Sequence, residues 1–341
     1  MKRHKQLFGQ IASFEMLHAA YLKARRGKRY TPEVLAFTAH LEDRLLELRN
    51  ELLKGEYHTG QYQRFVVCEP KERLVAALPF RDRVVHHALC GVIEPIFERQ
   101  FIADSYACRV GKGTHKAVDK LQYFLRAIRN LYGDAVWFLK ADIAKCFPSI
   151  DHDILRSIIT RSIGCKKTLK LIGEIIDSWE HGLGRGIPIG NLTSQLFANI
   201  YLNQIDQFVK HELKTRYYLR YMDDFVMLSG SKRQLHEWKK RIAEFTDSRL
   251  TLRLNSKTNV MPVAQGVNFC GYRTWWSHRL LRNASARRMR RKLKAFEWKY
   301  AADEIDFQRV NASVQSWLGH ARHANTYKLR KKMFGQFTLG K

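Results

Sequence analysis

The sequence lacks the features that mark several common classes of protein. No apolar run approaches the roughly 20 residues that a helix needs to cross a bilayer, and the basic start, MKRHKQLFGQ, is not followed by the apolar segment of a secretory signal. Cysteine is sparse: the six in the chain show no CxxC spacing, and no His or Cys cluster completes a zinc pattern. These absences argue against a membrane span, a disulfide framework and a zinc domain, and they favour scattered thiols in a reducing cytoplasm.

Acidic residues are also few. The chain has 60 Lys and Arg against 32 Asp and Glu, which gives a formal net charge of +28. Such an excess needs counter-charge, and nucleic acid is the commonest partner of a strongly basic protein. A generic solubility charge or an anionic membrane surface would be the alternatives, although no amphipathic membrane anchor is apparent.

The composition that remains is that of a folded protein. Hydrophobic residues make up 45% of the 341 positions and aromatic residues 12%, which argues against disorder. A chain of this length buries a substantial core and is expected to form two or three subdomains.

Periodicity divides the chain into alternating helical and strand-like segments. A helix is expected after Ser13, another from Pro32 to Gly55, and a strand hairpin over 62–80 with its turn at Pro70. The remaining expectations are helices at 82–101, 151–180, 191–213 and 231–250, strands at 135–142, 217–228, 251–260 and 266–276, a glycine-rich loop at 181–190, and a basic helical unit beyond about 280.

Two adjacent acids, Asp223 and Asp224, interrupt the hydrophobic stretch RYYLRYMDDFVMLSG. Adjacent carboxylates repel each other, and packed strands on either side desolvate them. A solvent-exposed acidic turn would be the simplest explanation. The functional alternative is a divalent cation, because hard carboxylate oxygens suit Mg²⁺ bound together with substrate phosphates.

A third acid, Asp142, ends the apolar strand VWFLKAD. If that strand lies beside the hairpin, three carboxylates converge in the two-metal arrangement used for phosphoryl transfer. The alternative is an acid that caps a turn at the strand end. Asp151 and Asp153, in SIDHDIL, are better explained as capping acids at a helix N-terminus.

Several motifs, in order along the chain, resemble those of reverse transcriptases. They are KER at 71–73 and FRDRVVHHAL at 80–89, similar to fingers motifs, and ADIAKCF at 141–147, YMDD at 221–224 and FCGY at 269–272, similar to palm and primer-grip motifs. The segment IGNLTSQ at 189–195 is similar to the variant found in reverse transcriptases of diversity-generating retroelements. KARRGKR, DSYACRVGKGTHKAV and SWLGHARHANTYKL also look like that subfamily.

The resemblance implies an α+β fold, a right-hand polymerase whose palm is an antiparallel sheet backed by helices. Fingers with N-terminal helices would occupy 1–135, the palm 136–280 and a basic helical thumb 281–341. Enzymes of this kind resemble group II intron proteins without the maturase and endonuclease extensions, and the short segment after the palm motifs fits that expectation.

The resemblance also implies roles for single residues. Asp142, Asp223 and Asp224, with the carbonyl of Ile143, would hold two Mg²⁺ ions, with Mn²⁺ as a substitute. Phe147 lies where the family has its steric gate, which would exclude a ribose 2′-hydroxyl and favour deoxynucleotides. A core phenylalanine is the alternative.

Further residues would bind the nucleotide and the template. Lys71 and Arg73 would clamp the triphosphate of the dNTP, unless they are a solvated turn. Lys257 matches a family lysine that protonates the leaving group. The remaining residues of the expected nucleotide site are Ile189, Gly190, Ser194, Gln195, Tyr221 and Met222. For 189–195, an ordinary loop and helix start is the alternative.

Three conspicuous motifs are assigned no catalytic role. GKGT at 111–114 lacks the spacing of a P-loop and is expected as a loop near the template. The pair His86-His87 is expected to be structural, because metal-binding pairs on a helix usually need i, i+4 spacing. Trp275 and Trp276 are expected in the core rather than as a stacking platform.

The function implied is that of an RNA-directed DNA polymerase that copies a template-repeat RNA into cDNA with errors at template adenines, for mutagenic retrohoming. Its partners would be template RNA, primer and cDNA, and a small basic accessory variability protein, in the cytoplasm of a bacterium or archaeon or encoded by a phage. Another bacterial reverse transcriptase, of the retron, group II intron or defence type, is an alternative. A non-catalytic nucleic-acid-binding protein is a more distant one.

Overall fold

The computed structural model describes residues 3–68, 72–179 and 181–340, and these fold into two compact units. The first unit comprises Met1–Arg109, Ile143–Lys214 and Arg241–Ser256. The second comprises Val110–Asp142, Thr215–Lys240 and Lys257–Lys341. Each unit is therefore built from segments that are far apart in the sequence, and the chain passes repeatedly from one to the other.

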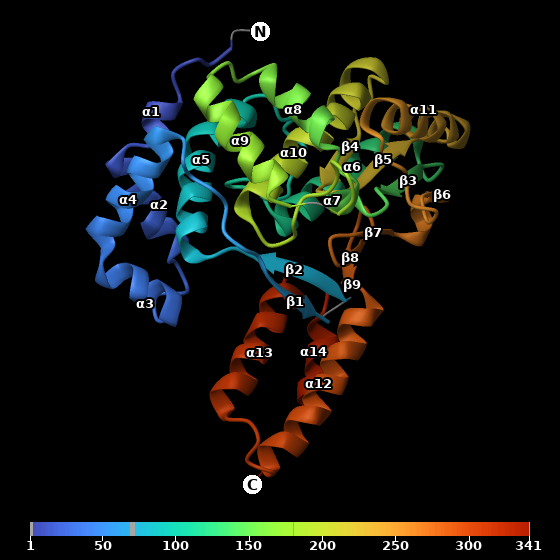
Figure 1. Cartoon of the computed structure of the whole chain (residues 1–341). Helices are drawn as coiled ribbons and strands as arrows, with labels where there is room; N and C mark the ends of the chain where they lie inside the picture. The colour runs from blue at the N-terminus through green and yellow to red at the C-terminus, as the bar shows by residue number, and fades with distance from the viewer. Residues whose placement is uncertain (1–2, 69–71, 180, 341) are drawn as a thin grey trace. The chain divides into compact units, whose positions relative to one another are not determined.

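The first unit is mainly helical. Its helices are α1 (Phe8–Ile11), α2 (Phe14–Ala24), α3 (Pro32–Ala39), α4 (Leu41–Lys54), α5 (Phe80–Glu98), α7 (Cys146–Ser149), α8 (His152–Thr160), α9 (Lys166–Asp177) and α10 (Leu192–Gln207), which continues as a π-helical turn over Phe208–Glu212. Helix α5 is the centre of the unit, because α2, α1, α3 and α10 all pack against it (Figure 1). Helix α11 (Lys232–Leu250) contributes its C-terminal part.

Local sequence signals explain where several of these helices begin and end. The Ser13 hydroxyl accepts a hydrogen bond from the amide of Met16 at 3.2 Å, as expected of a helix cap. Gly55 closes α4 in the left-handed conformation, with φ of 77°. The single helix expected from Pro32 to Gly55 is wrong, because the backbone at His40 leaves the helical region and divides it into α3 and α4.

Two further expectations about segment limits are also wrong. The helical stretch expected over 151–180 is two helices, α8 and α9, and Asp151 caps the first by accepting from the amides of Asp153 and Ile154. The strand expected over 251–260 begins only at Asn259, and before it the chain makes an isolated bridge between Leu254 and Ile143. Backbone pairing of this kind is decided by distant partners rather than by local alternation.

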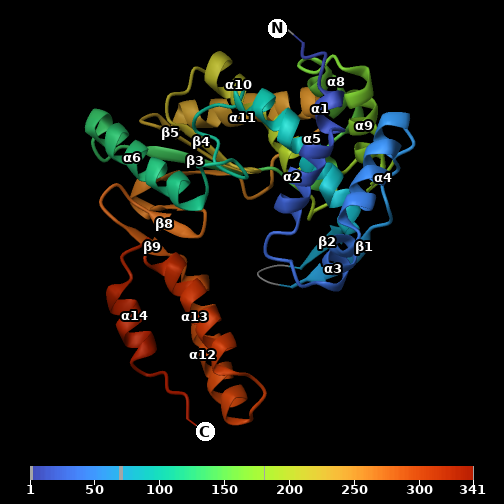
Figure 2. The ribbon, with the colours of Figure 1, turned by 90° about the vertical axis from the view of Figure 1, so that its left-hand side faces the viewer.

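The second unit contains a four-stranded antiparallel sheet in the order β4-β5-β3-β6. Its strands are β3 (Trp137–Asp142), β4 (Tyr218–Tyr221), β5 (Asp224–Ser229) and β6 (Asn259–Pro262). Helix α6 (Thr114–Tyr132) lies along β4 and β5, as Figure 2 shows. Strand β3, which ends at Asp142, therefore sits in the sheet interior between β5 and β6.

The C-terminal part of the same unit starts with a small antiparallel sheet of β7 (Val267–Phe269), β8 (Tyr272–Thr274) and β9 (Arg279–Leu281). Helices α12 (Asn283–Ala301), α13 (Phe307–Ala321) and α14 (Tyr327–Phe334) follow it. They share an apolar cluster of Met289, Leu293, Phe296, Val310 and Met333. The apolar face expected in the basic segment after 280 is therefore a packing face, and its arginines point outward.

Two global expectations can be checked against the described residues. Among them, no helix combines the length and the hydrophobicity that a membrane span requires. The structure contains free thiols at Cys68, Cys90, Cys108, Cys146, Cys165 and Cys270.

Candidate active site

The YMDD segment forms the tight turn of the β4–β5 hairpin. Tyr221 and Asp224 are paired across the hairpin, so Met222 and Asp223 make a two-residue loop. Met222 has a φ of 55°, a left-handed conformation that is uncommon for a residue with a side chain. Strained backbone of this kind persists where the surrounding structure holds it, and it clusters at functional sites.

Arg220 is one of the groups that hold this turn. Its side chain is 0% exposed, and its Nη1 donates a hydrogen bond to the carbonyl oxygen of Met222 at 2.9 Å. Its Cα partner across the hairpin is Phe225, so it lies on the sheet face opposite to that of Asp224. Arg220 is not among the residues predicted for the site, although a charged residue inside an otherwise apolar strand is a signal that identifies it.

Asp142 lies directly opposite Asp224 in the β3–β5 ladder. Directly opposite residues of antiparallel strands have Cα atoms about 4.5–5.5 Å apart, and their side chains share a face of the sheet. The expectation that the strand ending at Asp142 lies beside the hairpin is therefore confirmed. The side chains of Asp142 and Asp224 consequently lie on the same face of the sheet, next to the Met222–Asp223 turn.

Lys140 joins this acidic pair. It lies two residues before Asp142 on the same face, and its ammonium group forms an ion pair with the carboxylate of Asp224. The pKa of Asp224 is raised to about 6, chiefly by burial; the charge of Lys140 lowers it, and the negative charges of Asp142 and Asp223 raise it. Lys140 therefore supplies positive charge to a carboxylate that burial and like charge make costly to ionise.

The donor set suits a hard divalent cation in its chemistry, since it consists of carboxylate oxygens on one face. Within the described ranges, however, no three His, Cys, Asp or Glu side chains are grouped so that they could hold a metal ion. The structure thus brings Asp142 and Asp224 together and places an ammonium against the second. The assignment of Asp142, Asp223, Asp224 and Ile143 as metal ligands stays a prediction.

Two other candidate residues belong to the same unit. The phenol oxygen of Tyr221 accepts a hydrogen bond from the hydroxyl of Thr114, at the start of α6, at 3.1 Å. This places GKGT, which ends at Thr114, next to the YMDD strand. Lys257 is exposed in the loop before β6, and the neighbouring carbonyl of Thr258 accepts from Nζ of Lys239 at 2.8 Å. A proton-donating role for Lys257 stays a prediction.

In the first unit, the candidate triphosphate residues lie on a hairpin of β1 (Gln63–Val67) and β2 (Arg73–Ala77). Arg73 is exposed at the start of β2. The expected turn at Pro70 and the candidate residue Lys71 fall outside the described residues. The structure therefore gives Arg73 an accessible guanidinium group but leaves its triphosphate contact a prediction.

The 189–195 segment packs against this hairpin. The amide of Ala76 donates to the carbonyl of Ile189 at 2.9 Å, which extends the contact of β2 to the loop before α10. Gly190 has a φ of 126°, and a Cβ atom there would lie 2.9 Å from the carbonyl oxygen of Ala76. Glycine is therefore required at 190 by the close approach of β2, whatever its part in binding the nascent base pair.

The remaining candidates differ in exposure. Phe147, in α7, is only partly buried, so it is not an ordinary core phenylalanine. Ile143 is 1% exposed and Ser194 is 2% exposed, whereas Gln195 is partly exposed. Ser194 therefore contributes to the packing of α10, and its expected place in the nucleotide and template site stays a prediction.

The histidine pair and the tryptophan pair can also be placed. His86 is buried, and its Nδ1 is hydrogen-bonded to the hydroxyl of Thr193 at 2.9 Å, which agrees with a structural role. The core placement expected for the tryptophans is wrong. Trp276 is 40% exposed, with the guanidinium of Arg129 at 4.0 Å from its ring centroid, and Trp275 is partly exposed and stacked on His278.

Comparison with known proteins decides the family. A model of the family described as reverse transcriptase (RNA-dependent DNA polymerase) matches residues 68–274, which is more than half of the chain. The chain belongs to the reverse transcriptase family. The matched residues include the Asp142 strand, the YMDD hairpin and the 189–195 segment, which are the segments that form the candidate site. Polymerases of this family use divalent metal ions and deoxynucleoside triphosphates.

Two bacterial proteins are similar in sequence. Protein YkfC of Escherichia coli (strain K12) is 27% identical over 288 residues, which cover 72% of this chain and 74% of that protein. The Group II intron-encoded protein LtrA of Lactococcus lactis subsp. cremoris is 28% identical over 211 residues, which cover 59% of this chain. The matched region spans 33% of the length of the intron-encoded protein.

A solved structure supports the fold. Telomerase from Candida tropicalis, in complex with a TWJ fragment of telomeric RNA, superposes with a TM-score of 0.51 over 85% of this chain and 57% of that chain, at 11% sequence identity. At this identity the likeness concerns the fold alone. It agrees with a mixed α and β right-hand polymerase whose sheets are antiparallel, as the sequence predicts.

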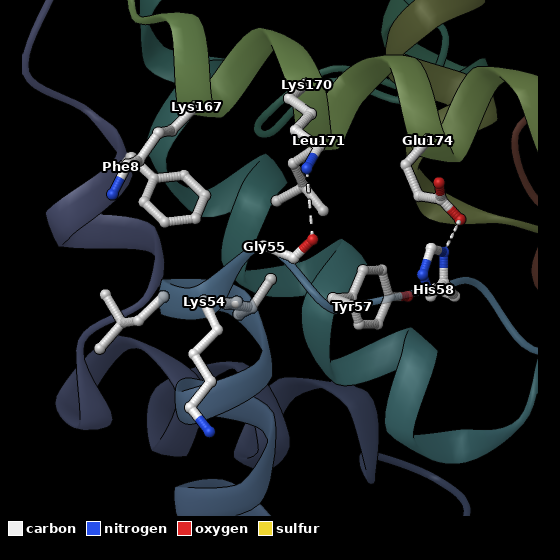
Figure 3. A pocket seen from close by; sticks show the side chains of 11 residues that line it. Phe8, Lys54, Gly55, Tyr57, His58, Lys167, Lys170, Leu171 and Glu174 are labelled. Carbon is white, nitrogen blue, oxygen red and sulfur yellow. Dashed lines mark hydrogen bonds and ion pairs between the residues drawn. The ribbon is translucent and has the colours of Figure 1, made fainter.

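A surface pocket of about 220 Å³ lies in the first unit, and the residues that line it do not include any of the described predicted site residues (Figure 3). Apolar side chains of Phe8, Leu52, Tyr57 and Leu171 line it, together with lysines of α4 and α9. Nζ of Lys170 donates to the carbonyl of Gly55 at 3.3 Å at its edge. The pocket is smaller than the roughly 300–1,000 Å³ of most small-molecule sites, and its lysines add to the basic surface.

Proposed function

We propose that this chain synthesises cDNA on an RNA template, with Asp142, Asp223 and Asp224 as the ligands of its divalent metal ions. The observation that supports this role most strongly is the pairing of Asp142 with Asp224 beside the YMDD turn. Two strands that are rigidly paired hold these carboxylates on one face. Membership of the reverse transcriptase family supplies the reaction type.

The chemistry is the transfer of a nucleotidyl group. The primer 3′-hydroxyl releases its proton to solvent and its oxygen bonds to the α-phosphorus of the dNTP, the bond from that phosphorus to the bridging oxygen breaks, and pyrophosphate leaves. Asp142, Asp223 and Asp224 would hold the divalent ions, whose positive charge would lower the pKa of the 3′-hydroxyl and offset the charge of the leaving pyrophosphate. Lys257 would give a proton to the departing pyrophosphate oxygen, which completes the balance of charge.

The other candidate residues would choose and orient the substrate. Arg73 would contact the triphosphate oxygens through its planar guanidinium group. The partly exposed ring of Phe147 would occupy the space of a 2′-hydroxyl and so favour deoxynucleotides. Tyr221 would be held in position by Thr114, its hydrogen-bond partner. Ile189, Gly190 and Gln195 would lie near the templating base.

Primer extension tests the assignment of the acids. The purified chain is incubated with a DNA primer on an RNA template, dNTPs and Mg²⁺, and product length is measured. Asp223→Asn should lower the extension rate by at least about a hundredfold, which corresponds to about 2.7 kcal/mol. The matched control is Asp153→Asn, an exposed acid in the first turn of α8, which should extend like the unaltered chain. Normal extension by Asp223→Asn would exclude the proposed metal role.

We further propose that the enzyme serves a diversity-generating retroelement, in which template adenines are copied with errors. The segment IGNLTSQ carries this proposal, because Ile189 replaces the glutamine usual in other reverse transcriptases. We propose that this change loosens contacts to the templating base. Sequencing of cDNA made on a defined template should then show errors concentrated at adenines, and Ile189→Gln should reduce them. An unchanged adenine error rate would contradict the proposal.

A group II intron-type enzyme is the second candidate, because LtrA and this chain are similar over the polymerase region. The flanking DNA distinguishes the two. Two near-identical repeats that differ mainly at adenines would support the diversity-generating subtype, whereas flanking intron sequence would support the alternative.

The partners follow from the proposed function. Template RNA, primer and cDNA would bind the basic surface, including the arginines of α12. A small basic accessory variability protein is proposed as a further partner, with the element RNA as a bridge between two positively charged proteins. We propose a cytoplasmic location, in keeping with free thiols and with the intracellular nucleic acids that the enzyme would copy.

A further inference from the structure

Lys140 has an unusual position for a lysine, because it is largely buried and lies among the candidate metal ligands. Its side chain is 18% exposed, and its ammonium group is paired with the carboxylate of Asp224, whose side chain is 29% exposed. Strand β3 places Lys140 and Asp142 on one face, two residues apart. The ammonium group of Lys140, at the end of a flexible four-carbon side chain, therefore pairs with Asp224, one of the carboxylates expected to bind Mg²⁺.

The same ammonium group contacts a second functional segment. It lies 5.4 Å from the ring centroid of Phe269, the first residue of the FCGY segment that resembles a primer grip. Phe269 is 0% exposed in β7, so the ring is fixed by its packing. The ammonium of Lys140 therefore lies against both Asp224 and the strand expected to hold the primer end.

The positive charge of Lys140 affects both the stability of the acidic pair and its affinity for a metal ion. Neighbouring, partly buried carboxylates are costly to ionise without counter-charge, and Lys140 supplies that charge to Asp224. A divalent ion bound by the same carboxylate would be repelled by an ammonium group at contact distance.

We propose that Lys140 is an internal counter-ion of the acidic pair, that it competes with the divalent metal ion for Asp224, and that its contact with Phe269 couples metal binding to primer binding. This inference rests on the proposed metal role of the aspartates. When a metal ion binds Asp224, the ammonium of Lys140 moves away from that carboxylate. A primer end that draws the ammonium toward the β7 strand would strengthen metal binding, and a metal ion would strengthen primer binding equally.

Lys140 therefore acts as a positioning residue rather than a catalytic one. An ordinary structural ion pair would stabilise the fold, and its loss would leave metal affinity unchanged or weaker. The competing counter-ion predicts the opposite sign: removal of the ammonium should strengthen metal binding. The two roles are distinguished by the direction of one equilibrium measurement.

The test is a titration of the full chain with Mn²⁺, in which the electron paramagnetic resonance signal of free Mn²⁺ measures binding without turnover. Lys140→Met should lower the Mn²⁺ dissociation constant at least about fivefold, the lower end of usual coupling between sites. Lys140→Arg, which keeps the charge, should bind like the unaltered chain. The control is Lys232→Met, whose ammonium lies 4.9 Å from the Trp137 ring centroid at the other end of β3, and it should change nothing.

The coupling to the primer is tested with the same signal. Addition of a DNA primer on an RNA template should tighten Mn²⁺ binding in the unaltered chain at least about fivefold and in Lys140→Met less than about twofold. Equal effects of the duplex in both proteins would overturn the coupling. Weaker or unchanged Mn²⁺ binding by a folded Lys140→Met would overturn the competition.

Folding and the metal site itself need separate controls. Circular dichroism in EDTA should show Lys140→Met folded with a lower melting temperature, and Mn²⁺ should restore it, because the ion replaces the lost counter-charge. Asp142→Asn should weaken Mn²⁺ binding whatever residue stands at 140. If it does not, the proposed metal role fails, whereas a failure confined to the Lys140 variants concerns the counter-ion alone.

Discussion

At the scale of single residues, burial changes the protonation of side chains and so their effect on stability. His86 is the clearest case away from the candidate active site. Burial, followed by the nearby charge of His87, lowers the pKa of His86 to about 3. Its ring is consequently neutral in the fold and bonded to Thr193, whereas the unfolded chain takes up a proton near pH 6.5.

This difference predicts a loss of stability in mild acid. Between about pH 6.5 and pH 3 the unfolded state binds the extra proton, so the free energy of unfolding falls as pH falls. From pH 7 to pH 5 the loss from His86 should be about 2 kcal/mol. Urea unfolding at both pH values measures it. The loss should be smaller in His86→Gln and unchanged in the control His40→Gln, an exposed histidine. Equal losses in all three proteins would contradict the assignment.

Gly190 predicts a second residue-scale effect. Its positive φ and the 2.9 Å approach to the carbonyl oxygen of Ala76 leave no room for a Cβ atom. Gly190→Ala should therefore lower the free energy of unfolding by about 1–3 kcal/mol. Gly173→Ala, in α9, is the matched control, because nothing lies within 4 Å of its Cβ position. Chemical denaturation of both variants checks the prediction, and equal stability would refute it.

Phe147 gives a prediction about the substrate. If its partly exposed ring excludes the ribose 2′-hydroxyl, Phe147→Ala should raise the use of ribonucleotides relative to deoxynucleotides at least about tenfold, or 1.4 kcal/mol. Single-nucleotide extension with a ribonucleotide and with its deoxy counterpart measures the ratio. An unchanged ratio would show that Phe147 serves packing alone.

At the scale of elements, the β4–β5 hairpin positions Asp223 and Asp224. Its two-residue loop contains a left-handed Met222, and Arg220 holds the carbonyl of that residue from the opposite face of the sheet. The loop conformation therefore depends on a buried charged side chain rather than on glycine, which two-residue hairpins usually use.

Loss of that support should be measurable. Arg220→Met removes a buried donor and leaves the Met222 carbonyl without it, so the free energy of unfolding should fall by about 1–3 kcal/mol. Arg216→Met, an exposed arginine just before β4, should change it by no more than about 0.5 kcal/mol. Thermal and urea unfolding of the two variants give the comparison. A stable Arg220→Met would mean that the turn holds without this hydrogen bond.

At the scale of the whole molecule, the net charge of +28 dominates. Helix α12 shows how the fold uses it: Met289, Leu293 and Phe296 are buried, while the arginines and lysines between them are exposed. An apolar stripe that is fully packed leaves a basic outer surface, which is the arrangement needed to bind phosphates.

Binding of RNA should therefore depend steeply on salt. Fluorescence anisotropy with a labelled RNA should give a linear fall of the logarithm of affinity with the logarithm of salt concentration. Replacing Arg288 and Arg291 by Gln should reduce this slope by about 2, since each phosphate contact contributes about 1. The same replacement at Arg44 and Arg156, which are paired with acids in the first unit, should leave it unchanged. An unaltered slope in the first pair would exclude α12 from the interface.

Particular residues show how far prediction from the sequence reaches. The proximity of Asp142 and Asp224 was predictable, because an apolar strand ends in the first acid and the turn of an apolar hairpin contains the second. Lys140 and Arg220 were not selected. Their roles depend on cross-strand neighbours and on depth, and both lie inside stretches whose pattern indicates only a buried strand. Trp275 and Trp276 were misplaced for a related reason, since burial of a tryptophan pair depends on what covers the sheet edge.

The charge, the family motifs and the types of most elements follow from the amino-acid sequence alone, because they depend on composition, order and local periodicity. The tertiary structure decided that helices break at His40, that Gly190 is needed by strand β2, and that a lysine faces the second aspartate of YMDD. Each of these depends on atoms brought together from distant parts of the chain. Contact and burial, rather than local preference, fix them.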